Sequence, residues 1–167
     1  MKMCSERLHF KKLVSSDAAT YRNMATNEAV MKYITGRALE PKEARIRLNN
    51  MLEINKEIPE IGFYKVYQSK PNHFIGLGKL VLVENSTAEI GYSLLPEFWG
   101  KKYASEIAGF FINYASNIPY IKELIAVINP QNAASKKLLS NYKFTWLETG
   151  FINQQQAEIY KLILDKP

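Results

Sequence analysis

The chain has 167 residues, of which 47% are hydrophobic and 23% charged, a composition that is typical of a globular domain and excludes a wholly disordered chain. Its formal net charge is +6, and its length suffices for one domain with its own core, which we expect to span residues 1–167. Apolar runs such as 107–112 are far shorter than the roughly 20 residues that cross a membrane, and charged residues precede any apolar stretch at the N-terminus, so neither a membrane span nor a secretory signal is expected.

The first part of the chain predicts one strand followed by two helices. Residues 8–14 alternate as in a strand. Ser15, Ser16 and Asp17 are helix-capping types, and they predict a helix from there to about residue 34. Gly36 ends this segment, and Pro41, which the first turn of a helix tolerates, opens the second helix.

After Gly62 the spacing of apolar residues changes from about four to two, which predicts strands at 63–68, 74–83 and 88–95. Short turns join these strands, so we expect an antiparallel meander. Gly76 and Gly78 inside the middle strand indicate a bulge or the close approach of another backbone.

A helix is predicted after Gly100, because apolar residues recur there at helical spacing: Ile107, Phe110, Phe111, Tyr114 and Ala115. The rest of the chain predicts a strand at 121–128, a short helix capped by Asn132, and closing strands at 144–147 and 158–164. The predicted order is β-α-α-β-β-β-α-β-α-β-β, an α+β arrangement.

The clearest chemical signal is the strand, loop and helix start at 88–107. Such a loop directs unpaired backbone N–H groups one way, and the helix dipole adds partial positive charge, a combination that binds phosphate groups. Lys101 and Lys102 add full charges. Similar loops also occur in domains where they bind nothing, so the residues alone leave both interpretations open.

Three motifs occur in one order and spacing: residues 7–13 (RLHFKKL), residues 89–92 (EIGY) with 96–106 (PEFWGKKYASE), and residues 129–139 (NPQNAASKKLL). Together they resemble the first strand, the fourth strand with its pyrophosphate loop, and the Asn-x-x-Ser helix of the Gcn5-related N-acetyltransferases (GNAT), in the branch that acetylates the N-termini of ribosomal proteins. The resemblance covers nearly the whole chain. It implies the GNAT fold, a mixed and mostly antiparallel central sheet flanked by helices, and an acetyl-CoA-dependent N-acetyltransferase.

The resemblance also implies where acetyl-CoA binds: the pyrophosphate on the loop, the pantetheine along the end of the fourth strand, and a backbone N–H there on the thioester oxygen. The implied residues are Leu94, Leu95, Trp99, Gly100, Lys101, Lys102, Tyr103, Ala104, Ser105, Asn132 and Ser135. The family usually carries glycine where this chain has Lys102 and Lys143, and lysine adopts a positive φ less readily than glycine.

In this family the acceptor amine attacks the thioester directly, so the amine must lose a proton and the thiolate must be stabilised. The resemblance places Ser135 near the CoA sulfur as a hydrogen-bond donor, since Leu139 stands where many relatives have a tyrosine. Glu89 lies on the central strand where the family often has a carboxylate, and it is the candidate base. Ser135 as an ordinary polar helix residue and Glu89 as a solvent-facing strand residue remain alternatives.

The acceptor itself stays open. In the family, the first two helices and the last hairpin form the acceptor groove, here residues 21–47 and 147–156 with the polar run Asn153-Gln-Gln-Gln. No dense acidic patch occurs there, which counts against a polyamine. A peptide N-terminal amine and a small-molecule amine both remain, and so do a monomer and a homodimer.

Other function classes remain as alternatives. Lys102 and the missing tyrosine leave open a non-catalytic acyl-CoA-binding protein of this fold. The charge of +6 suggests nucleic acid, but no basic run exceeds two residues, so we expect no nucleic-acid partner. Cys4 is the only cysteine and the two histidines are far apart in sequence, so we expect no metal site and a reducing, cytoplasmic location.

Overall fold

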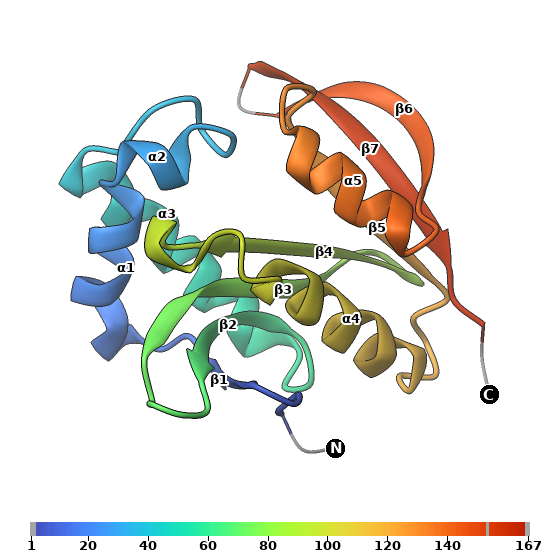
Figure 1. Ribbon diagram of the computed structural model, residues 1–167, viewed down its shortest axis with the longest axis horizontal. Helices are drawn as coiled ribbons and strands as arrows, with labels where there is room; N and C mark the ends of the chain where they lie inside the picture. Colours follow the sequence, from blue (N-terminus) through green and yellow to red (C-terminus); the bar gives the residue numbers. More distant parts are fainter. Residues whose placement is uncertain (1–2, 153, 166–167) are drawn as a thin grey trace.

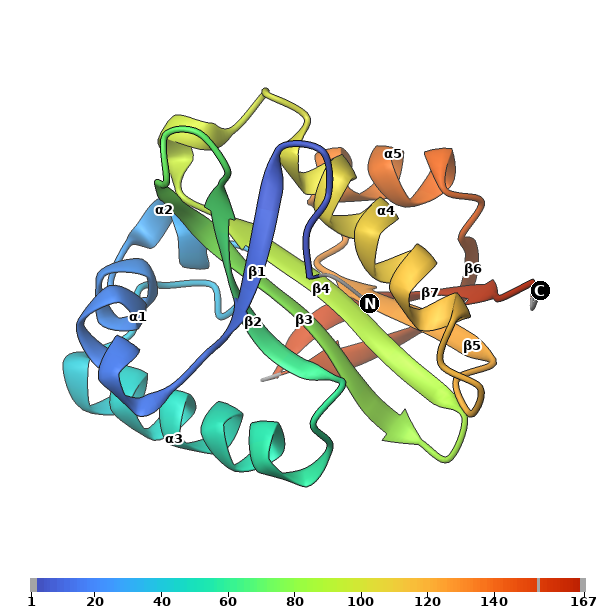
Figure 2. The same ribbon diagram turned by 90° about the horizontal axis from the view of Figure 1, so that it is seen from below.

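The computed structural model describes residues 3–152 and 154–165, which build one seven-stranded sheet with helices on both of its faces (Figures 1 and 2). The strands are β1 (Leu8–Lys12), β2 (Gly62–Gln68), β3 (Phe74–Glu84), β4 (Thr87–Leu94), β5 (Glu123–Ile128), β6 (Thr145–Ile152) and β7 (Gln155–Ile163). The helices are α1 (Ala18–Ala25), α2 (Glu28–Met31), α3 (Pro41–Glu57), α4 (Tyr103–Ser116) and α5 (Ala133–Asn141), with short 3₁₀ turns η1 (Ser15–Asp17) and η2 (Pro96–Phe98). None of the helices in the described ranges is both long and apolar enough to cross a bilayer.

The sheet has the order β1-β2-β3-β4-β5-β7-β6, and β4 with β5 is its parallel pair. All other neighbours are antiparallel. The predicted GNAT fold is confirmed in this topology, and so is the meander of β2, β3 and β4 at its centre.

Helices cover the sheet on two sides, and each side has its own apolar cluster. On one side, Ile107 and Phe111 of α4 pack with Leu80 and Ile90 of the central strands. On the other side, residues of α1 and α3 form a second cluster with Leu77 of β3. Figure 2 shows α1 and α3 on one side of the strands and α4 and α5 on the other.

Gly76 and Gly78 of β3 each let a neighbouring group come close to the strand, a backbone at Gly76 and a side chain at Gly78. A Cβ atom on Gly76 would lie 2.1 Å from the Ser93 carbonyl oxygen, so here a neighbouring backbone comes close. A Cβ atom on Gly78 would lie 2.6 Å from the ring of Phe111, so here an aromatic side chain of α4 fills the space.

The first helical segment differs from the single helix that the sequence predicts, because it is divided into η1, α1 and α2. Asn27 divides α1 from α2: its side chain accepts a hydrogen bond from the Val30 N–H at 3.2 Å and so caps α2. Asp17 does not cap α1. Its carboxylate accepts the Val14 N–H at 2.8 Å and pairs with the largely buried Lys65 ammonium of β2 at 2.7 Å, so both of its oxygens have partners outside α1.

The last two strands are longer than predicted and meet in a hairpin whose tip includes Gln154. Almost every residue of β6, which forms one edge of the sheet, is exposed. An exposed edge strand lacks the alternation of buried and exposed residues, so its full length could not be recognised from the sequence.

Candidate functional site

The two central strands β4 and β5 separate after three residue pairs. The parallel register joins Thr87 with Glu123, Ala88 with Leu124 and Glu89 with Ile125. Beyond this point β4 continues beside β3, and β5 continues beside β7. The sheet therefore opens between β4 and β5, and we call this opening the β4–β5 split.

Of the backbone N–H groups of Leu94 and Leu95, one is directed toward the split and the other is used within the sheet. The Leu95 N–H donates to the Ile75 carbonyl at 2.9 Å, so it is used within the sheet. In an antiparallel ladder the direction of these groups alternates, so the N–H of Leu94 points to the opposite edge, toward the split. The Leu94 carbonyl accepts the Trp99 indole N–H at 2.9 Å, which fixes Trp99 beside the strand end.

The loop between β4 and α4 has the conformation of an anion-binding turn. Gly100 and Lys102 both lie in the left-handed region, with φ of 72° and 63°. Lys102 is the N-cap of α4, and the first intrahelical bond runs from the Glu106 N–H to its carbonyl at 3.1 Å. The N–H groups of Tyr103, Ala104 and Ser105 precede this bond, so they are the donors that a helix start offers to a phosphate.

The N-terminal segment holds this loop in place through Glu106. The Glu106 carboxylate accepts the Ser5 hydroxyl at 2.6 Å, the Arg7 backbone N–H at 2.8 Å and the Arg7 guanidinium at 2.7 Å. Arg7 also donates to the Lys101 carbonyl at 3.3 Å and lies over the Tyr103 ring. Burial raises the pKa of Glu106, but the hydrogen bonds from Ser5 and Arg7 and the Arg7 charge outweigh it, so that pKa lies below its usual value.

Glu89, the candidate base, is the last β4 residue paired with β5, so it lies where the split begins. Its carboxylate forms an ion pair with the Lys79 ammonium of β3 at 2.5 Å. The carboxylate is mostly buried but not enclosed, since 15% of the side chain is exposed. The position fits a base at the closed end of the split, and the solvent-facing alternative does not describe it.

Ser135 and Asn132 lie at the start of α5. The Asn132 side-chain oxygen accepts the Ser135 N–H at 3.1 Å and so caps the helix, as predicted. This leaves the Asn132 amide N–H groups as donors for a ligand. The Ser135 hydroxyl oxygen accepts a hydrogen bond from the Tyr92 hydroxyl of β4 at 3.2 Å, a contact that joins α5 to β4 across the split.

Sequence reasoning missed two tyrosines of this region. Burial raises the pKa of Tyr92 more than its hydrogen bond to Ser135 lowers it. The phenol therefore stays protonated at neutral pH and can donate a hydrogen bond. Tyr142 donates to the Ser105 carbonyl at 2.7 Å and ties the end of α5 to the first turn of α4. For Tyr92 the one available signal was its place in the EIGY motif; for Tyr142 no local pattern pointed to the contact.

A groove of about 520 Å³ overlaps the predicted acceptor region, and of its lining residues Asn50 alone lies outside residues 21–47 and 147–156. It is lined by Thr35, Arg37, Leu39, Glu43, Ile46, Arg47, Asn50 and Gln154. Asn153 of the predicted polar run lies outside the described residues. Arg37 and Glu43 form a double hydrogen bond at 2.6 and 2.8 Å, which lowers the pKa of Glu43 to about 2 and keeps its carboxylate engaged at neutral pH.

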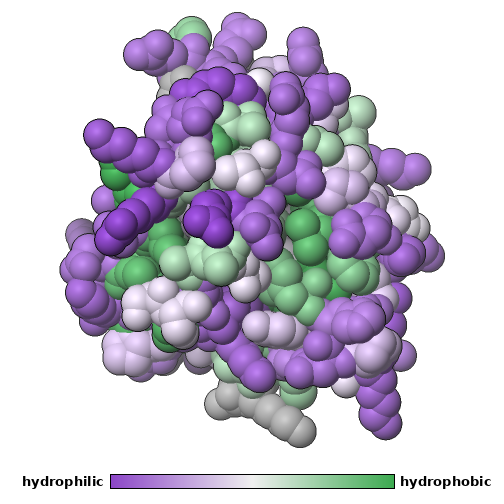
Figure 3. Space-filling model, turned by 90° about the vertical axis from the view of Figure 1, so that its left-hand side faces the viewer, coloured by the Kyte–Doolittle hydropathy of each residue, from purple (hydrophilic) through white to green (hydrophobic). Residues whose placement is uncertain are grey.

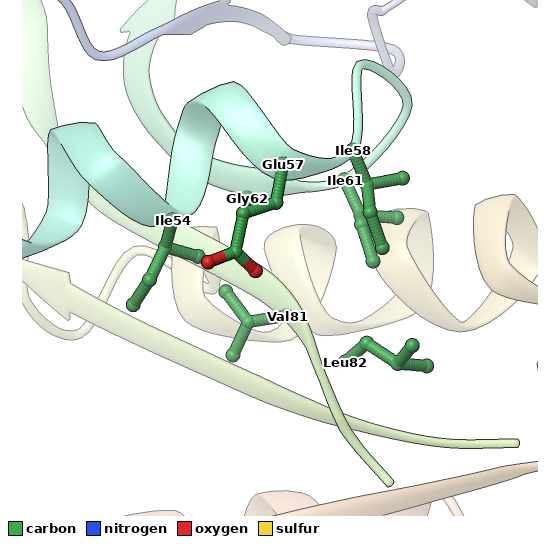
Figure 4. Close-up of a pocket in the computed structure, with 7 residues that line it drawn as sticks. All are labelled: Ile54, Glu57, Ile58, Ile61, Gly62, Val81 and Leu82. Carbon is green, nitrogen blue, oxygen red and sulfur yellow. The ribbon is translucent and has the colours of Figure 1, made fainter. Parts of the chain in front are cut away.

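A second, smaller pocket lies at the other end of α3, against β2 and β3 (Figure 4). Its volume is about 20 Å³, room for little more than one water molecule. Ile54, Ile61 and Val81 are among its mostly apolar lining residues, which Figure 4 draws as sticks. This size excludes it as a substrate site.

Within residues 3–152 and 154–165 there is no group of three or more His, Cys, Asp or Glu side chains placed to hold a metal ion. On the side that carries α1 and α2, polar and charged side chains separate the apolar areas from one another (Figure 3).

Comparison with known proteins converges on one family. Residues 7–145 match the family model described as an acetyltransferase (GNAT) domain. A curated relative, the uncharacterized N-acetyltransferase p20 of Bacillus licheniformis, is 27% identical over 145 residues, which cover 84% of this chain and 80% of that protein.

Solved structures of the same fold match over nearly the full length. A RimL ribosomal L7/L12 alpha-N-protein acetyltransferase in complex with coenzyme A has a TM-score of 0.81 at 16% identity, covering 98% of this chain and 97% of that one. The spermidine N-acetyltransferase of Vibrio cholerae, in complex with CoA and spermine, has a TM-score of 0.78 at 18% identity, covering 96% and 97%. At these identities the likeness establishes the fold.

Proposed function

The chain belongs to the GNAT acetyltransferase family and is an acyltransferase, and from this premise we propose that it transfers the acetyl group of acetyl-CoA to an amine that attacks the thioester directly. The observation that supports this most is the β4–β5 split, which begins after three residue pairs. The anion-binding turn lies at the end of β4, and Ser135 is joined to Tyr92 of the same strand.

Acetyl-CoA fits the groups that these elements offer. Its pyrophosphate is anionic, and the turn supplies backbone donors at the helix start together with the charges of Lys101 and Lys102. Its pantetheine arm carries amides, which match the Leu94 N–H and the amide of Asn132. The thioester oxygen would take one such N–H where negative charge develops.

Glu89 is the group that we propose to remove a proton from the amine. An aliphatic amine with a pKa of about 10 is mostly protonated at neutral pH and cannot attack until it loses a proton. The Glu89 carboxylate lies where the split begins, and its ion pair with Lys79 fixes its position. Ser135 stabilises the departing thiolate by donating a hydrogen bond.

For the acceptor we propose a peptide N-terminal amine or a small-molecule amine. In the 520 Å³ groove, the Glu43 carboxylate is taken by Arg37, and Arg47 adds a further positive charge. These positive charges would repel a polyamine, which carries several positive charges. They would not repel an acceptor whose remaining groups are neutral or negatively charged. The two enzymes of known structure described above have different acceptors, a ribosomal protein and spermidine. The shared fold therefore does not identify the acceptor of this chain.

An acceptor panel tests this proposal. Release of the CoA thiol from acetyl-CoA would be followed with short peptides bearing a free α-amine, with small primary amines and with spermidine. We expect release with at least one peptide or small amine well above the rate without acceptor, and little with spermidine. Binding of acetyl-CoA without release for any amine would contradict the proposal and favour the non-catalytic acyl-CoA-binding alternative.

A further inference from the structure

We propose that Tyr92 is a positioning residue that turns the hydroxyl proton of Ser135 toward the CoA sulfur. The inference rests on the proposed function, since it concerns the leaving group of the acetyl transfer. It assigns a role to a partly buried phenol that the proposed chemistry does not otherwise use.

The geometry joins two elements that the fold would otherwise leave apart at this point. Tyr92 lies on β4 beyond Glu89, the last residue paired with β5. Ser135 lies in the first turn of α5, where it is 8% exposed. Their hydroxyl oxygens are 3.2 Å apart, with Tyr92 as the donor.

The direction of this hydrogen bond decides where the Ser135 proton can go. A serine hydroxyl has one proton and two acceptor lone pairs. Because Tyr92 donates to the oxygen, the Ser135 proton cannot point at Tyr92 and is left for a different acceptor. Donation into a hydroxyl also polarises it, which makes the Ser135 O–H a better donor.

Burial keeps Tyr92 in the donor form. The pKa of Tyr92 is raised because the phenol is buried, and its hydrogen bond to Ser135 offsets this only in part. The phenol therefore holds its proton over the whole neutral range. The position seven residues after Asn132 is filled by Leu139, which is 1% exposed and has no proton to donate. The phenol near the leaving group thus comes from β4 rather than from α5.

The acetyl transfer balances with both hydroxyls intact. The nitrogen lone pair forms the new C–N bond, the C–S bond breaks, and its electron pair goes to sulfur. Starting from an ammonium, the acceptor loses two protons: one passes through the base to solvent, and the other ends on the CoA thiolate. Ser135 donates a hydrogen bond to the sulfur while it carries negative charge, and Tyr92 keeps its own proton.

The test is the titration of the thiol of CoA bound to the enzyme, followed by the ultraviolet absorbance of the thiolate. A hydrogen bond to the thiolate lowers the pKa of the bound thiol, so Ser135→Ala should raise that pKa by about one. Tyr92→Phe, which removes only the hydroxyl, should raise it by roughly half as much. In the Ser135→Ala background, Tyr92→Phe should have no further effect, because Tyr92 acts through Ser135.

Tyr64→Phe is the matched control. Tyr64 is 3% exposed and its hydroxyl donates to the Glu60 carbonyl at 2.7 Å, so this variant also loses one buried phenol hydrogen bond, away from the split. It should leave the thiol titration unchanged. Acetyl-CoA turnover with an acceptor should follow the same pattern, with kcat lowered about tenfold by Ser135→Ala and about threefold by Tyr92→Phe, and with KM for acetyl-CoA little changed.

Failure of this inference differs from failure of the proposed function. If CoA binds and the titration is the same in wild type and Tyr92→Phe, or if Tyr92→Phe still acts in the Ser135→Ala background, Tyr92 has no positioning role. If CoA does not bind the wild-type protein at all, the proposed function fails and takes this inference with it.

Discussion

Lys102 and Lys143 adopt left-handed backbone conformations, with φ of 63° and 62°. For a residue with a Cβ atom this conformation costs about 1–2 kcal/mol relative to the right-handed one. Each lysine stands at a helix end that requires it: Lys102 precedes α4, and Lys143 follows α5 in a turn where the Phe144 N–H donates to the Leu139 carbonyl at 3.0 Å. The backbone thus keeps the shape that glycine usually provides at both positions.

Lys143→Gly should raise the free energy of unfolding by about 1 kcal/mol, because it removes the left-handed strain at an exposed site. Lys137→Gly is the matched control. It deletes the same side chain from an exposed position inside α5, where glycine should lower the free energy of unfolding by about 1 kcal/mol. Urea unfolding measures both, and equal losses for the two variants would contradict the strain at residue 143.

Lys102→Gly should weaken acetyl-CoA binding by roughly threefold to tenfold, even as it relieves strain, because the turn already has its shape and only a charge is lost. Lys102→Arg keeps the charge and should keep the affinity. Calorimetric titration at low and high salt measures the effect, which should shrink as salt rises. Tighter binding by Lys102→Gly would mean that the lysine side chain crowds the cofactor instead.

Glu89→Gln should lower kcat on the order of 100-fold with the best acceptor, since the amide cannot take the ammonium proton. Acetyl-CoA affinity should remain, because Glu89 is not assigned to the cofactor. Lys79→Met keeps the Glu89 carboxylate but removes its ion-pair partner. Comparing the two variants therefore distinguishes the loss of the base itself from the loss of the contact that holds it. Turnover by Glu89→Gln close to that of the wild type would exclude Glu89 as the base.

For individual residues, the sequence motifs indicated which positions lie at the candidate site but not which side chains contact one another there. The motifs pointed to Glu89, Lys102, Asn132 and Ser135, and the structure places all four at the split or its flanking helix starts. The hydroxyl of Tyr92 could not be assigned, since its partner is 43 residues away and the pairing exists only once α5 packs beside β4.

The start of α4 is an element that depends on a distant segment. Glu106 in its first turn is held by Ser5 and Arg7, about a hundred residues earlier in the chain, and Arg7 reaches the Lys101 carbonyl of the loop. This network places the helix start against β1. The position of the N-terminal segment therefore helps to fix the shape of the anion-binding turn.

Glu106→Gln should lower the free energy of unfolding at pH 7 by about 1 kcal/mol, the size of a partly exposed charged hydrogen-bond network. The pKa of Glu106 is lowered in the folded protein, so its contribution is complete above the unfolded value of about 4.3 and is lost as the pH falls through the lower folded value. The difference between wild type and variant in urea unfolding should therefore shrink as the pH is lowered from 7 to 3. A constant difference between pH 7 and pH 3 would contradict this linkage.

Element boundaries were predicted where local signals dominate and missed where tertiary contacts decide. Pro41 and Asn132 mark the starts of α3 and α5 as expected. The helix through residues 17–34 is divided because Asn27 caps a new helix and Asp17 turns to Lys65 of β2. Neither choice can be recognised without knowing what lies beside the segment.

For the whole molecule, the order of elements followed from the periodicity of the sequence, whereas the split was implied only by the family resemblance, which gives the fourth strand a splayed end. Hydrophobic periodicity gives strands and helices, and the motifs gave the family. That β4 and β5 pair over three residues and then separate depends on where α4, α5 and β7 pack, which no pattern along either strand records. The split is nevertheless the feature on which the proposed acetyl transfer depends.

The most direct test of the account is a thermal unfolding experiment with acetyl-CoA, CoA and a short DNA duplex in parallel. A ligand at 100 times its Kd adds about 2.7 kcal/mol, which raises the Tm of a chain of this length by roughly 5–10 °C. We expect such a rise with both CoA species and none with DNA. No rise with either CoA species would contradict a cofactor site at the β4–β5 split.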